Sequence, residues 1–370
     1  MDERFKDCSS SAIIVQGGNK CGCDSEGVAT PGIKGRVGAE DYAIAPEEWD
    51  KPPIAKCDVL YSVGGVYGNI EAMKKVREMV ESESGDVCVV YNGDYHWFDG
   101  NADNFLKVEQ LLEGFIPMNG NVELELARQQ DCGVGCGCSY PTTMSDAFVG
   151  RSNAIFGRMK EAIKNLPEVG ALGSRSAWGV VEVGETRVGI THGDETSVSG
   201  WGCSVENLQD PERRARLDSF FSERDIDVLS TTRTCAAAAL VLPHGVVINS
   251  GSAGLPEYRN KLFGLVNRVA KTPYPDAVYR ARIKDVFVEA APVRYDQDAF
   301  ITWFDSVWEQ DSPAAQSAFF RKEAPCGVSG QNQTWDWGRN GQDHGFVVIW
   351  ASCATFFRPI RLPMMAWSAT

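Results

Sequence analysis

Hydrophobic runs that end in glycine and polar residues alternate with segments of helical periodicity in the first half of the chain. The apolar run 59–63 leads into a glycine-rich loop at 64–69, and residues 70–80 place apolar side chains at helical spacing. Two further apolar runs, 87–91 and 115–118, also end in a glycine and a polar residue. The pattern predicts a strand at each apolar run, a helix over 70–80 and a polar corner after each strand.

The second half of the chain continues the same alternation. Residues 150–166 carry Ile155, Met159, Ile163 and Leu166 on one face of a predicted helix. Similar patterns predict strands at 180–183, 188–191, 226–229, 246–248, 278–282 and 286–290, and helices at 211–223 and 300–308. Strands that alternate with helices predict a layered α/β fold, with the functional site at the carboxyl ends of the strands.

The two ends of the chain have no sustained periodicity. Residues 1–52 are rich in glycine, serine, proline and charge, and the composition beyond residue 312 turns to glutamine, asparagine, glycine, proline and tryptophan. We therefore divide the chain into an amino-terminal arm at 1–52, a folded domain at 53–311 and an irregular tail at 312–370. The tail holds Trp335, Trp337, Trp350 and Trp367. Aromatic anchors often bury against a partner, so we expect this tail to bind a partner protein or to pack on its own domain.

Charge and composition indicate which kinds of partner and which cellular compartment to expect. The chain has 36 basic and 50 acidic residues, a net charge of −14 that repels a phosphate backbone, so we expect no nucleic-acid partner. The start has neither the apolar core of a signal peptide nor the composition of a transit peptide, which predicts a cytoplasmic location. The apolar stretch 345–357 is interrupted by polar residues and falls short of the ~20 residues of a spanning helix. We expect no membrane span.

Polar corners follow the predicted strands in a recognisable order. The corners are Gly68-Asn69, Gly93-Asp94, Gly120-Asn121-Val122-Glu123, His192-Gly193 and Asn249-Ser250-Gly251-Ser252. Read in this order, they resemble the signature of the calcineurin-like metallophosphoesterases. The resemblance implies a layered β-sandwich flanked by helices, and a two-metal site at the strand ends.

The metal ligands implied by the resemblance are incomplete. Asp94 stands at the place of the Asp that bridges both metals, whereas Gly65 and Tyr67 stand where the first metal would find its Asp and His. Thr231 replaces a His ligand of the second metal, and Arg233 replaces a His ligand of the first. The first site should therefore be empty, and no two-metal centre should form.

A single ion is the most that the remaining ligands allow. Asp94, Asn121 and His192 keep the places of second-metal ligands, and this mixture of oxygen and nitrogen donors suits Mn, Fe or Zn. The alternative is that no metal binds, because Asp and Asn also cap turns and His192 can be an ordinary hydrogen-bonded loop residue. We expect the three side chains to converge on one cavity.

The proton donor implied by the resemblance is also missing, because Val122 stands at its place. General acid catalysis commonly contributes about 10²–10⁴-fold, so hydrolysis should be impaired unless Glu123 or His96 substitutes as the catalytic acid.

The residues that replace the first-metal ligands suggest a phosphate site. Gly64 and Gly65 precede a predicted helix and would leave backbone N–H groups for an anion, while Arg233 would supply a permanent cation. We expect the Arg233 guanidinium to point into the cavity and to pair with Asp94 when no phosphate is bound.

Cysteines and a second glycine pattern leave two further alternatives. Cys132, Cys136 and Cys138 form a candidate thiolate metal site, although unligated loop thiols suit the same C-x-C spacing. The run 63–68 could open a Rossmann-like nucleotide site, but it is G-G-x-x-G and no ribose-binding acid follows.

Taken together, these patterns predict a metallophosphoesterase-like protein of impaired or absent activity, acting as a scaffold or accessory subunit or as a binder of a phosphorylated ligand. The alternative is a weak single-metal phosphoesterase acting on a phosphomonoester or phosphodiester.

Overall fold

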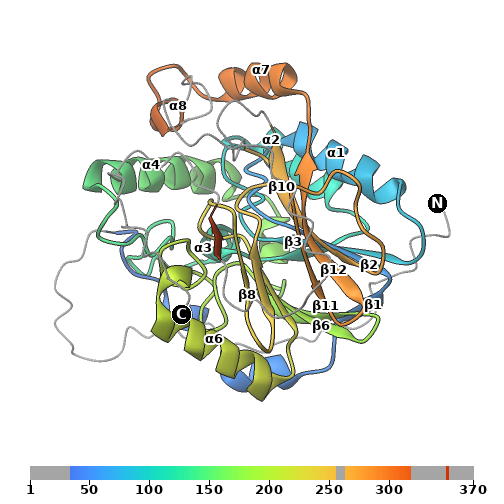
Figure 1. Cartoon of the computed structure of the whole chain (residues 1–370). Helices are drawn as coiled ribbons and strands as arrows, with labels where there is room; N and C mark the ends of the chain where they lie inside the picture. The colour runs from blue at the N-terminus through green and yellow to red at the C-terminus, as the bar shows by residue number, and fades with distance from the viewer. Residues whose placement is uncertain (1–33, 256–262, 318–346, 350–370) are drawn as a thin grey trace, which may run out of the picture.

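Two β-sheets form the centre of the computed structural model, which describes residues 34–255, 263–317 and 347–349 (Figure 1). One sheet has the strand order β1-β5-β6-β7-β9-β8-β13 and the other the order β11-β12-β10-β2-β3-β4. The strands are β1 Ala55–Cys57, β2 Val59–Val63, β3 Val87–Asn92, β4 Ile116–Met118, β5 Trp178–Val183, β6 Thr186–Thr191, β7 Val228–Thr231, β8 Ala238–Val241, β9 Val246–Asn249, β10 Gly264–Ala270, β11 Tyr279–Ile283, β12 Val286–Val293 and β13 Val347–Ile349. The helices are η1 Glu40–Tyr42, η2 Pro46–Asp50, α1 Ile70–Glu81, α2 Ala102–Leu111, α3 Asn121–Ala127, α4 Asp146–Ile163, α5 Val169–Leu172, η3 Asn207–Gln209, α6 Pro211–Arg224, α7 Gln297–Val307 and α8 Pro313–Ser317.

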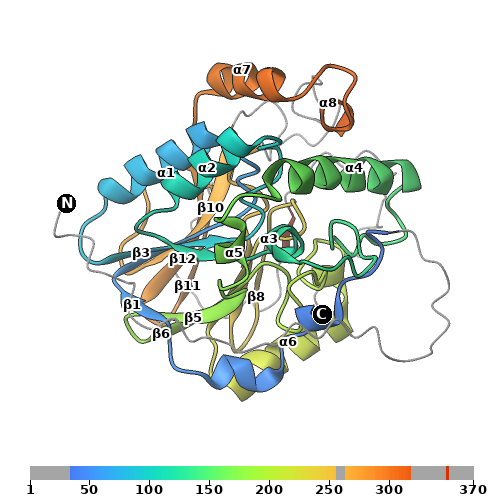
Figure 2. The ribbon, with the colours of Figure 1, turned by 180° about the vertical axis from the view of Figure 1, so that it is seen from behind.

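The sheets pack face to face, and helices cover both outer faces. Side chains from both sheets, among them Leu60, Val90, Ile190 and Leu265, form one apolar core between the sheets. Helices α1, α2, α4 and α7 cover the outer face of the six-stranded sheet, while α6 and η2 cover the other (Figures 1 and 2). The predicted α/β sandwich flanked by helices is confirmed.

Parallel strands bring the predicted corners to one edge of the sandwich. Strands β2, β3 and β4 pair in parallel in one sheet, and β6, β7 and β9 do so in the other. Gly65 N, in the corner after β2, donates a hydrogen bond to Gly93 O (3.1 Å), in the corner after β3. Ala253 N, in the corner after β9, donates to Gly64 O (2.9 Å), in the corner after β2. The strand carboxyl ends therefore form one connected polar edge.

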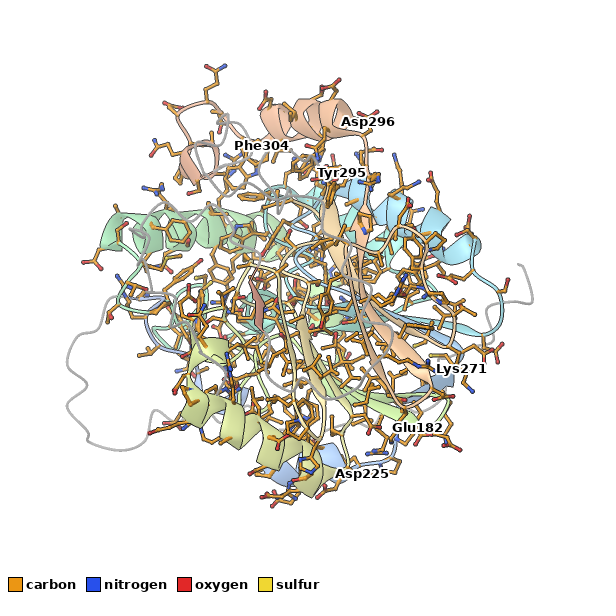
Figure 3. The ribbon with its side chains drawn as sticks, viewed as in Figure 1. Glu182, Asp225, Lys271, Tyr295, Asp296 and Phe304 are labelled. Atoms are coloured by element: carbon orange, nitrogen blue, oxygen red, sulfur yellow. The ribbon has the colours of Figure 1, made fainter. Side chains whose placement is uncertain are left out.

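A hydrogen bond links the start of helix α7 to the same edge of the sandwich. The Asp296 side chain caps its first turn by accepting from Ala299 N (3.0 Å), and the Tyr295 hydroxyl donates to Gly254 O (2.7 Å) in the corner after β9. Phe304 is buried under the helix, and Figure 3 shows Tyr295, Asp296 and Phe304 around this end of the molecule.

Several elements differ from the sequence-based expectations. The central strand β10, the edge strand β1 and the strand β8 lie in segments for which no strand was predicted, and β7 begins at Val228 instead of residue 226. Residues 34–52, expected within an arm, form η1 and η2 and bury Tyr42 and Trp49 against the seven-stranded sheet. In the tail, α8 buries Ala314 and β13 pairs with β8.

Candidate functional site

The turn after β3 presents Asp94 at the strand-end edge. Gly93 has a φ of +78°, and a Cβ there would lie 2.6 Å from both the Gly120 Cα and the His192 Nδ1, so only glycine lets these corners approach so closely. Asp94 itself has a left-handed φ of +52°. This strained conformation is over-determined by its neighbours, as commonly happens at functional sites.

Asp94 and His192 are in contact, with 3.3 Å between Oδ2 and Nε2. The His192 Nδ1 lies 3.0 Å from Asn92 O and 3.0 Å from the Thr232 hydroxyl, which itself donates to Asn92 O. A carbonyl oxygen only accepts, so the His192 Nδ1 carries a proton, and its Nε2 faces the Asp94 carboxylate. An imidazole nitrogen and a carboxylate oxygen are both groups that bind metal ions in proteins.

Asn121 lies at the same edge, at the start of α3. The Asp94 carboxylate accepts from the backbone N–H of the next residue, Val122. Burial raises the pKa of Asp94, but its interaction with the neighbouring His192, together with the charge of Arg233, holds that pKa below its ordinary value. The structure thus brings Asp94, Asn121 and His192 to one buried locus.

The candidate ligand atoms are among the buried polar atoms that have no hydrogen-bond partner. Asp94 Oδ1, Asn121 Oδ1 and His192 Nε2 are all buried and make no hydrogen bond. Buried polar atoms normally have partners, and these three atoms are of types that bind metal ions, so they are the candidate ligands for an ion here. No cluster of three His, Cys, Asp or Glu that could hold a metal occurs among the described residues, and here the third donor is an asparagine.

Arg233 is buried, with 2% of its surface exposed, and does not pair with Asp94. Its Nη2 donates to Cys138 O, while the guanidinium carbon lies 4.7 Å from the ring centre of Trp201 and 5.7 Å from that of Tyr140. The expected Arg233–Asp94 ion pair is therefore wrong for this state, because the carbonyl and the two rings hold the guanidinium while Asp94 contacts His192.

A short segment of the loop after α3 covers the site. The Asn121 side chain donates from Nδ2 to Cys136 O (2.9 Å) and reaches Cys138 Sγ (3.4 Å). Cys138 O accepts from Arg233 and from the Trp201 indole N–H (3.3 Å). Residues 136–138, which we call the covering segment, therefore close the strand-end site in this conformation.

The candidate phosphate-binding glycines have less donor capacity than expected. Gly65 N donates to Gly93 O, so this N–H is not available to an anion here. A Cβ on Gly64 would lie 2.3 Å from the Thr232 side chain, so this glycine permits close packing of two corners. Tyr67 directs its hydroxyl at Cys235 Sγ (2.6 Å), and Val122 is a buried apolar residue.

The two candidate catalytic acids are engaged in structural contacts. Glu123 accepts from the backbone N–H groups of Asp94 (2.9 Å), Gly120 (2.9 Å) and His96 (3.0 Å). Burial raises the pKa of Glu123, and the charge of Asp94 raises it further. The His96 ring lies between the carboxylates of Asp99 and Glu109.

The protonation of His96 follows from these two carboxylates. Burial by itself would lower its pKa, but the charge and hydrogen bond of Asp99 and the hydrogen bond of Glu109 raise it to about 9. His96 is therefore an imidazolium held in an internal ion cluster at neutral pH.

The three loop cysteines differ in state. Cys136 and Cys138 are buried free thiols, and Cys132 is disulfide-bonded. The three-thiolate metal site stays a prediction that requires Cys132 to be reduced, because a disulfide sulfur is not a thiolate. Sequence reasoning missed that backbone carbonyls of this loop, as well as the Cys138 thiol, contact the site residues.

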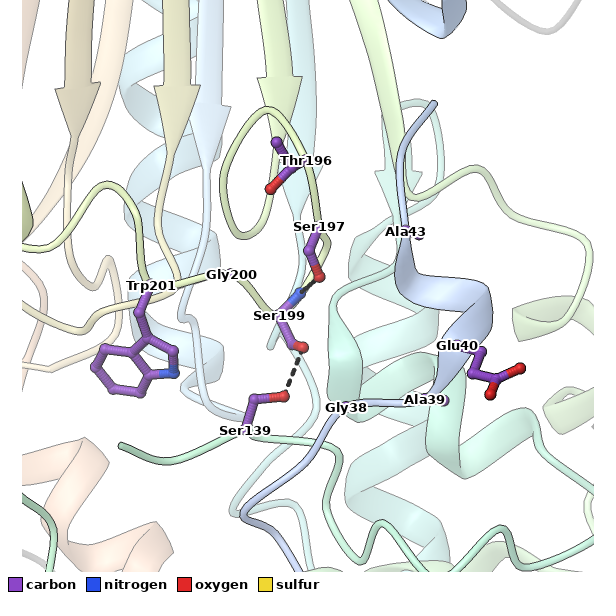
Figure 4. A pocket seen from close by; sticks show the side chains of 10 residues that line it. All are labelled: Gly38, Ala39, Glu40, Ala43, Ser139, Thr196, Ser197, Ser199, Gly200 and Trp201. Atoms are coloured by element: carbon purple, nitrogen blue, oxygen red, sulfur yellow. Dashed lines mark hydrogen bonds between the residues drawn. The ribbon is translucent and has the colours of Figure 1, made fainter. Parts of the chain in front are cut away.

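An open hollow of about 420 Å³ lies beside the covered site (Figure 4). Ser139, Ser197, Ser199 and Trp201 line it, and the Ser139 and Ser199 hydroxyls are 2.8 Å apart. Trp201 belongs both to the hollow and to the stack on Arg233. Its position after the His192 corner was the only sequence signal that could have identified it.

Other expectations concern regions beyond this edge. The tail residues Trp335, Trp337, Trp350 and Trp367 lie outside the described residues. Among the described residues, no helix has the length and apolar character needed to cross a membrane.

Comparisons with known proteins give structural likenesses only. No protein-family model matches the chain, and no curated protein matches it. A hypothetical protein from Pyrococcus horikoshii is 12% identical with a TM-score of 0.46, over 68% of this chain and 95% of that one. A metallophosphoesterase from Sphaerobacter thermophilus is 12% identical with a TM-score of 0.43, over 67% and 93%. Vacuolar protein sorting 29 from Cryptosporidium parvum is 14% identical with a TM-score of 0.30, over 65% and 99%. At these identities and TM-scores the likenesses carry no information about substrate or activity.

Proposed function

We propose that this chain is a metallophosphoesterase-like protein that binds a phosphate group at the strand-end site without hydrolysing its ester. The proposal rests on the burial of Arg233 and on the few partners that its guanidinium has. Its guanidinium is buried, and within the described part of the chain no carboxylate lies within ion-pair distance of it. Its Nε has no hydrogen-bond partner.

A buried cation of this kind favours an anionic ligand. Removing a guanidinium from water is costly unless an anion and hydrogen bonds compensate it, and one bond to the Cys138 carbonyl supplies only part of that compensation. A phosphate group offers several acceptor oxygens and can take two parallel N–H bonds from one guanidinium. The stacked rings of Trp201 and Tyr140 would hold the guanidinium in place for this contact.

The proposed lack of hydrolysis is supported by the residues that stand at the catalytic positions. Two-metal hydrolysis needs a clamp on both the attacking and the leaving oxygen, and Gly65, Tyr67 and Arg233 supply no ligand for a first ion. Val122 cannot donate a proton. Glu123 accepts hydrogen bonds from three backbone N–H groups, so its carboxyl group is not free to donate a proton at the site.

A second candidate function is a weak single-metal phosphoesterase. It is favoured by the three unpartnered atoms Asp94 Oδ1, Asn121 Oδ1 and His192 Nε2, which would hold one Mn, Fe or Zn ion. Such an ion would polarise a phosphoryl oxygen. The residues of this chain would then orient the phosphate through Arg233 and keep the His192 ring in place through Asn92 O and Thr232.

Calorimetric titration with inorganic phosphate in excess chelator tests the first proposal. We expect binding by the native chain and at least a tenfold loss in Arg233→Met, because about 1.4 kcal/mol of charge-assisted bonding corresponds to tenfold in affinity. Arg216→Met, at an exposed arginine of α6, is the matched control and should bind like the native chain. Equal binding by Arg233→Met and the native chain would refute the proposal.

Elemental analysis and a phosphodiester assay separate the two candidates. The phosphate-binding proposal predicts at most one ion per chain and no turnover of bis(p-nitrophenyl) phosphate with Mn²⁺ or Zn²⁺. Turnover that is lost in Asp94→Asn but retained in Asp225→Asn, an exposed carboxylate on the loop before β7, would establish the single-metal enzyme instead.

A further inference from the structure

The hollow beside the covered site has walls from three parts of the chain. Residues 38–43 of the amino-terminal segment form one wall, and residues 196–201 of the loop after β6 form the other. Ser139, which directly follows the covering segment, lies between them (Figure 4). The volume of about 420 Å³ falls within the range of about 300–1,000 Å³ that is typical of small-molecule sites.

Hydrogen bonds hold these walls in place without a ligand. The Asp194 carboxylate accepts from the backbone N–H groups of Ser197 (3.0 Å) and Gly202 (2.9 Å) in the loop after β6. Between these two residues, Val198 N donates to Tyr42 O (3.0 Å) and so joins the loop to the other wall. A preformed hollow binds a ligand at a lower entropic cost than one that must first be ordered.

The charges around the hollow disfavour an anion inside it. Among the described residues that line the hollow there is no Lys, Arg or His, and Glu40 is the one that carries a charge. A phosphate group would find no cationic partner there and would be repelled by Glu40. The hollow therefore suits the neutral part of a ligand.

Two hydroxyl groups that line the hollow bond to each other. The Ser139 and Ser199 oxygens are 2.8 Å apart. Their mutual bond uses the proton of one hydroxyl, so the pair keeps one O–H donor and further acceptor lone pairs. A ligand hydroxyl both donates and accepts, and therefore matches this pair. Gly38 leaves room beside the pair, because a Cβ there would lie 2.7 Å from each of the two oxygens.

Trp201 adds an aromatic surface to the hollow. Its side chain is partly exposed, and its indole N–H donates to Cys138 O (3.3 Å), which fixes the ring. An indole face packs well against an apolar surface, and the C–H face of a sugar ring is such a surface, with hydroxyls around its rim. The ring centre also lies 4.7 Å from the Arg233 guanidinium carbon, so the hollow and the candidate phosphate position are neighbours.

We propose that the hollow binds a sugar ring, with its C–H face on Trp201 and its hydroxyls on Ser139 and Ser199, and that the phosphorylated ligand of this chain is a sugar monophosphate. The second part rests on the proposed function, because it places the phosphate at Arg233. A nucleotide would instead present a flat base to Trp201, and the second experiment below separates these two ligands.

Saturation-transfer NMR with unphosphorylated sugars tests the hollow by itself. The full-length chain in phosphate-free buffer is mixed in turn with D-glucose, D-galactose, D-mannose and D-ribose. We expect transfer to the C–H protons of at least one sugar and its loss in Gly38→Val, whose side chain would fill the space beside the hydroxyl pair. Ser139→Ala, which removes a hydroxyl and adds no volume, should weaken the transfer as well.

Gly150→Ala in α4 is the control for this experiment, since a Cβ there has open space among the described residues. It should give the same transfer as the native chain. No transfer to any of the four sugars, or equal transfer in the native chain, Gly38→Val and Ser139→Ala, would overturn the proposal.

Calorimetry in excess chelator tests the ligand class. We expect the 6-phosphate of the best-binding hexose, or D-ribose 5-phosphate if ribose binds best, to bind at least about tenfold more tightly than inorganic phosphate, since each hydrogen bond adds roughly twofold to tenfold in affinity. Ser139→Ala should reduce this ratio, and Gly150→Ala should keep it. Equal affinity for the sugar phosphate and inorganic phosphate, or tighter binding of adenosine 5′-monophosphate than of the sugar phosphate, would overturn the sugar assignment and leave the proposed function intact. Sugar binding by NMR with no binding of either phosphate compound would refute the proposed function, while the sugar site stands.

Discussion

Glu123 is either a catalytic acid or a structural hydrogen-bond acceptor. Substituting it distinguishes these two roles. Its Oε2 accepts from Asp94 N and Gly120 N, and its Oε1 accepts from His96 N. Three donors require acceptor oxygens, so we expect the carboxylate to be ionised although burial raises its pKa. A catalytic acid would instead be protonated at neutral pH, and glutamine would mimic it well.

The expected loss of stability follows from the number of donors left unpaired. Glu123→Gln keeps one acceptor oxygen but turns an NH₂ group toward one backbone N–H, which costs about 1–3 kcal/mol for an unsatisfied buried donor. Glu123→Ala leaves all three N–H groups of Asp94, Gly120 and His96 unpaired. Because relaxation and water entry make such terms less than additive, we expect about 3–6 kcal/mol.

Denaturant unfolding at pH 7 measures both variants, with Glu113→Gln at an exposed position of the α2–β4 loop as the control. The midpoint should fall in the order control, Gln, Ala while the slope stays constant, which reports stability alone. A Glu123→Gln variant as stable as the native chain would refute the assignment of an ionised acceptor and return Glu123 to the role of a neutral acid.

Two further predictions concern the ion cluster and the core. Burial alone would raise the pKa of Glu109, but hydrogen bonds with His96 and Arg175 lower it from 4.5 to about 2. A carboxyl group whose pKa is lower in the folded than in the unfolded protein stabilises the fold at pH values above 4.5. This stabilisation is lost as the pH falls toward 2 and the group becomes protonated. Unfolding free energies of Glu109→Gln should therefore lie about 2–3 kcal/mol below native at pH 7, with the gap narrowing below pH 4.5, and a gap independent of pH would contradict the shift. Leu60→Ala, in the core between the sheets, should lose about 2–5 kcal/mol in the same assay, whereas Val37→Ala, 57% exposed, should change little.

Much of the fold could be predicted from local pattern. The run 59–63 and the helix after it appear as β2 and α1, and Ile155, Met159 and Ile163 are buried on one face of α4 as their spacing predicts. Periodicity predicts such elements because burial of one face is a local requirement. β10 escaped prediction because it carries Asn267 and Arg268, which break the apolar pattern.

Only the tertiary structure explains those two residues. Asn267 donates to the Ser230 hydroxyl (2.8 Å) in the opposite sheet, and Arg268 pairs with Glu83 (2.7 Å) and Glu289 (2.8 Å). Polar side chains are tolerated in a buried strand when distant partners satisfy them, and such partners cannot be inferred from the neighbouring sequence.

The candidate site also has features that the sequence predicts and features that only the tertiary structure determines. The sequence by itself determined that Asp94, Asn121 and His192 follow successive strands, and parallel pairing then brings them to one edge. Which atoms remain unpartnered there, and that Cys138 O rather than Asp94 holds Arg233, was decided only by the meeting of loops far apart in the chain. The physical reason is that the place of a strand along the chain follows from local burial, whereas each hydrogen bond at a corner depends on the position of the other corners.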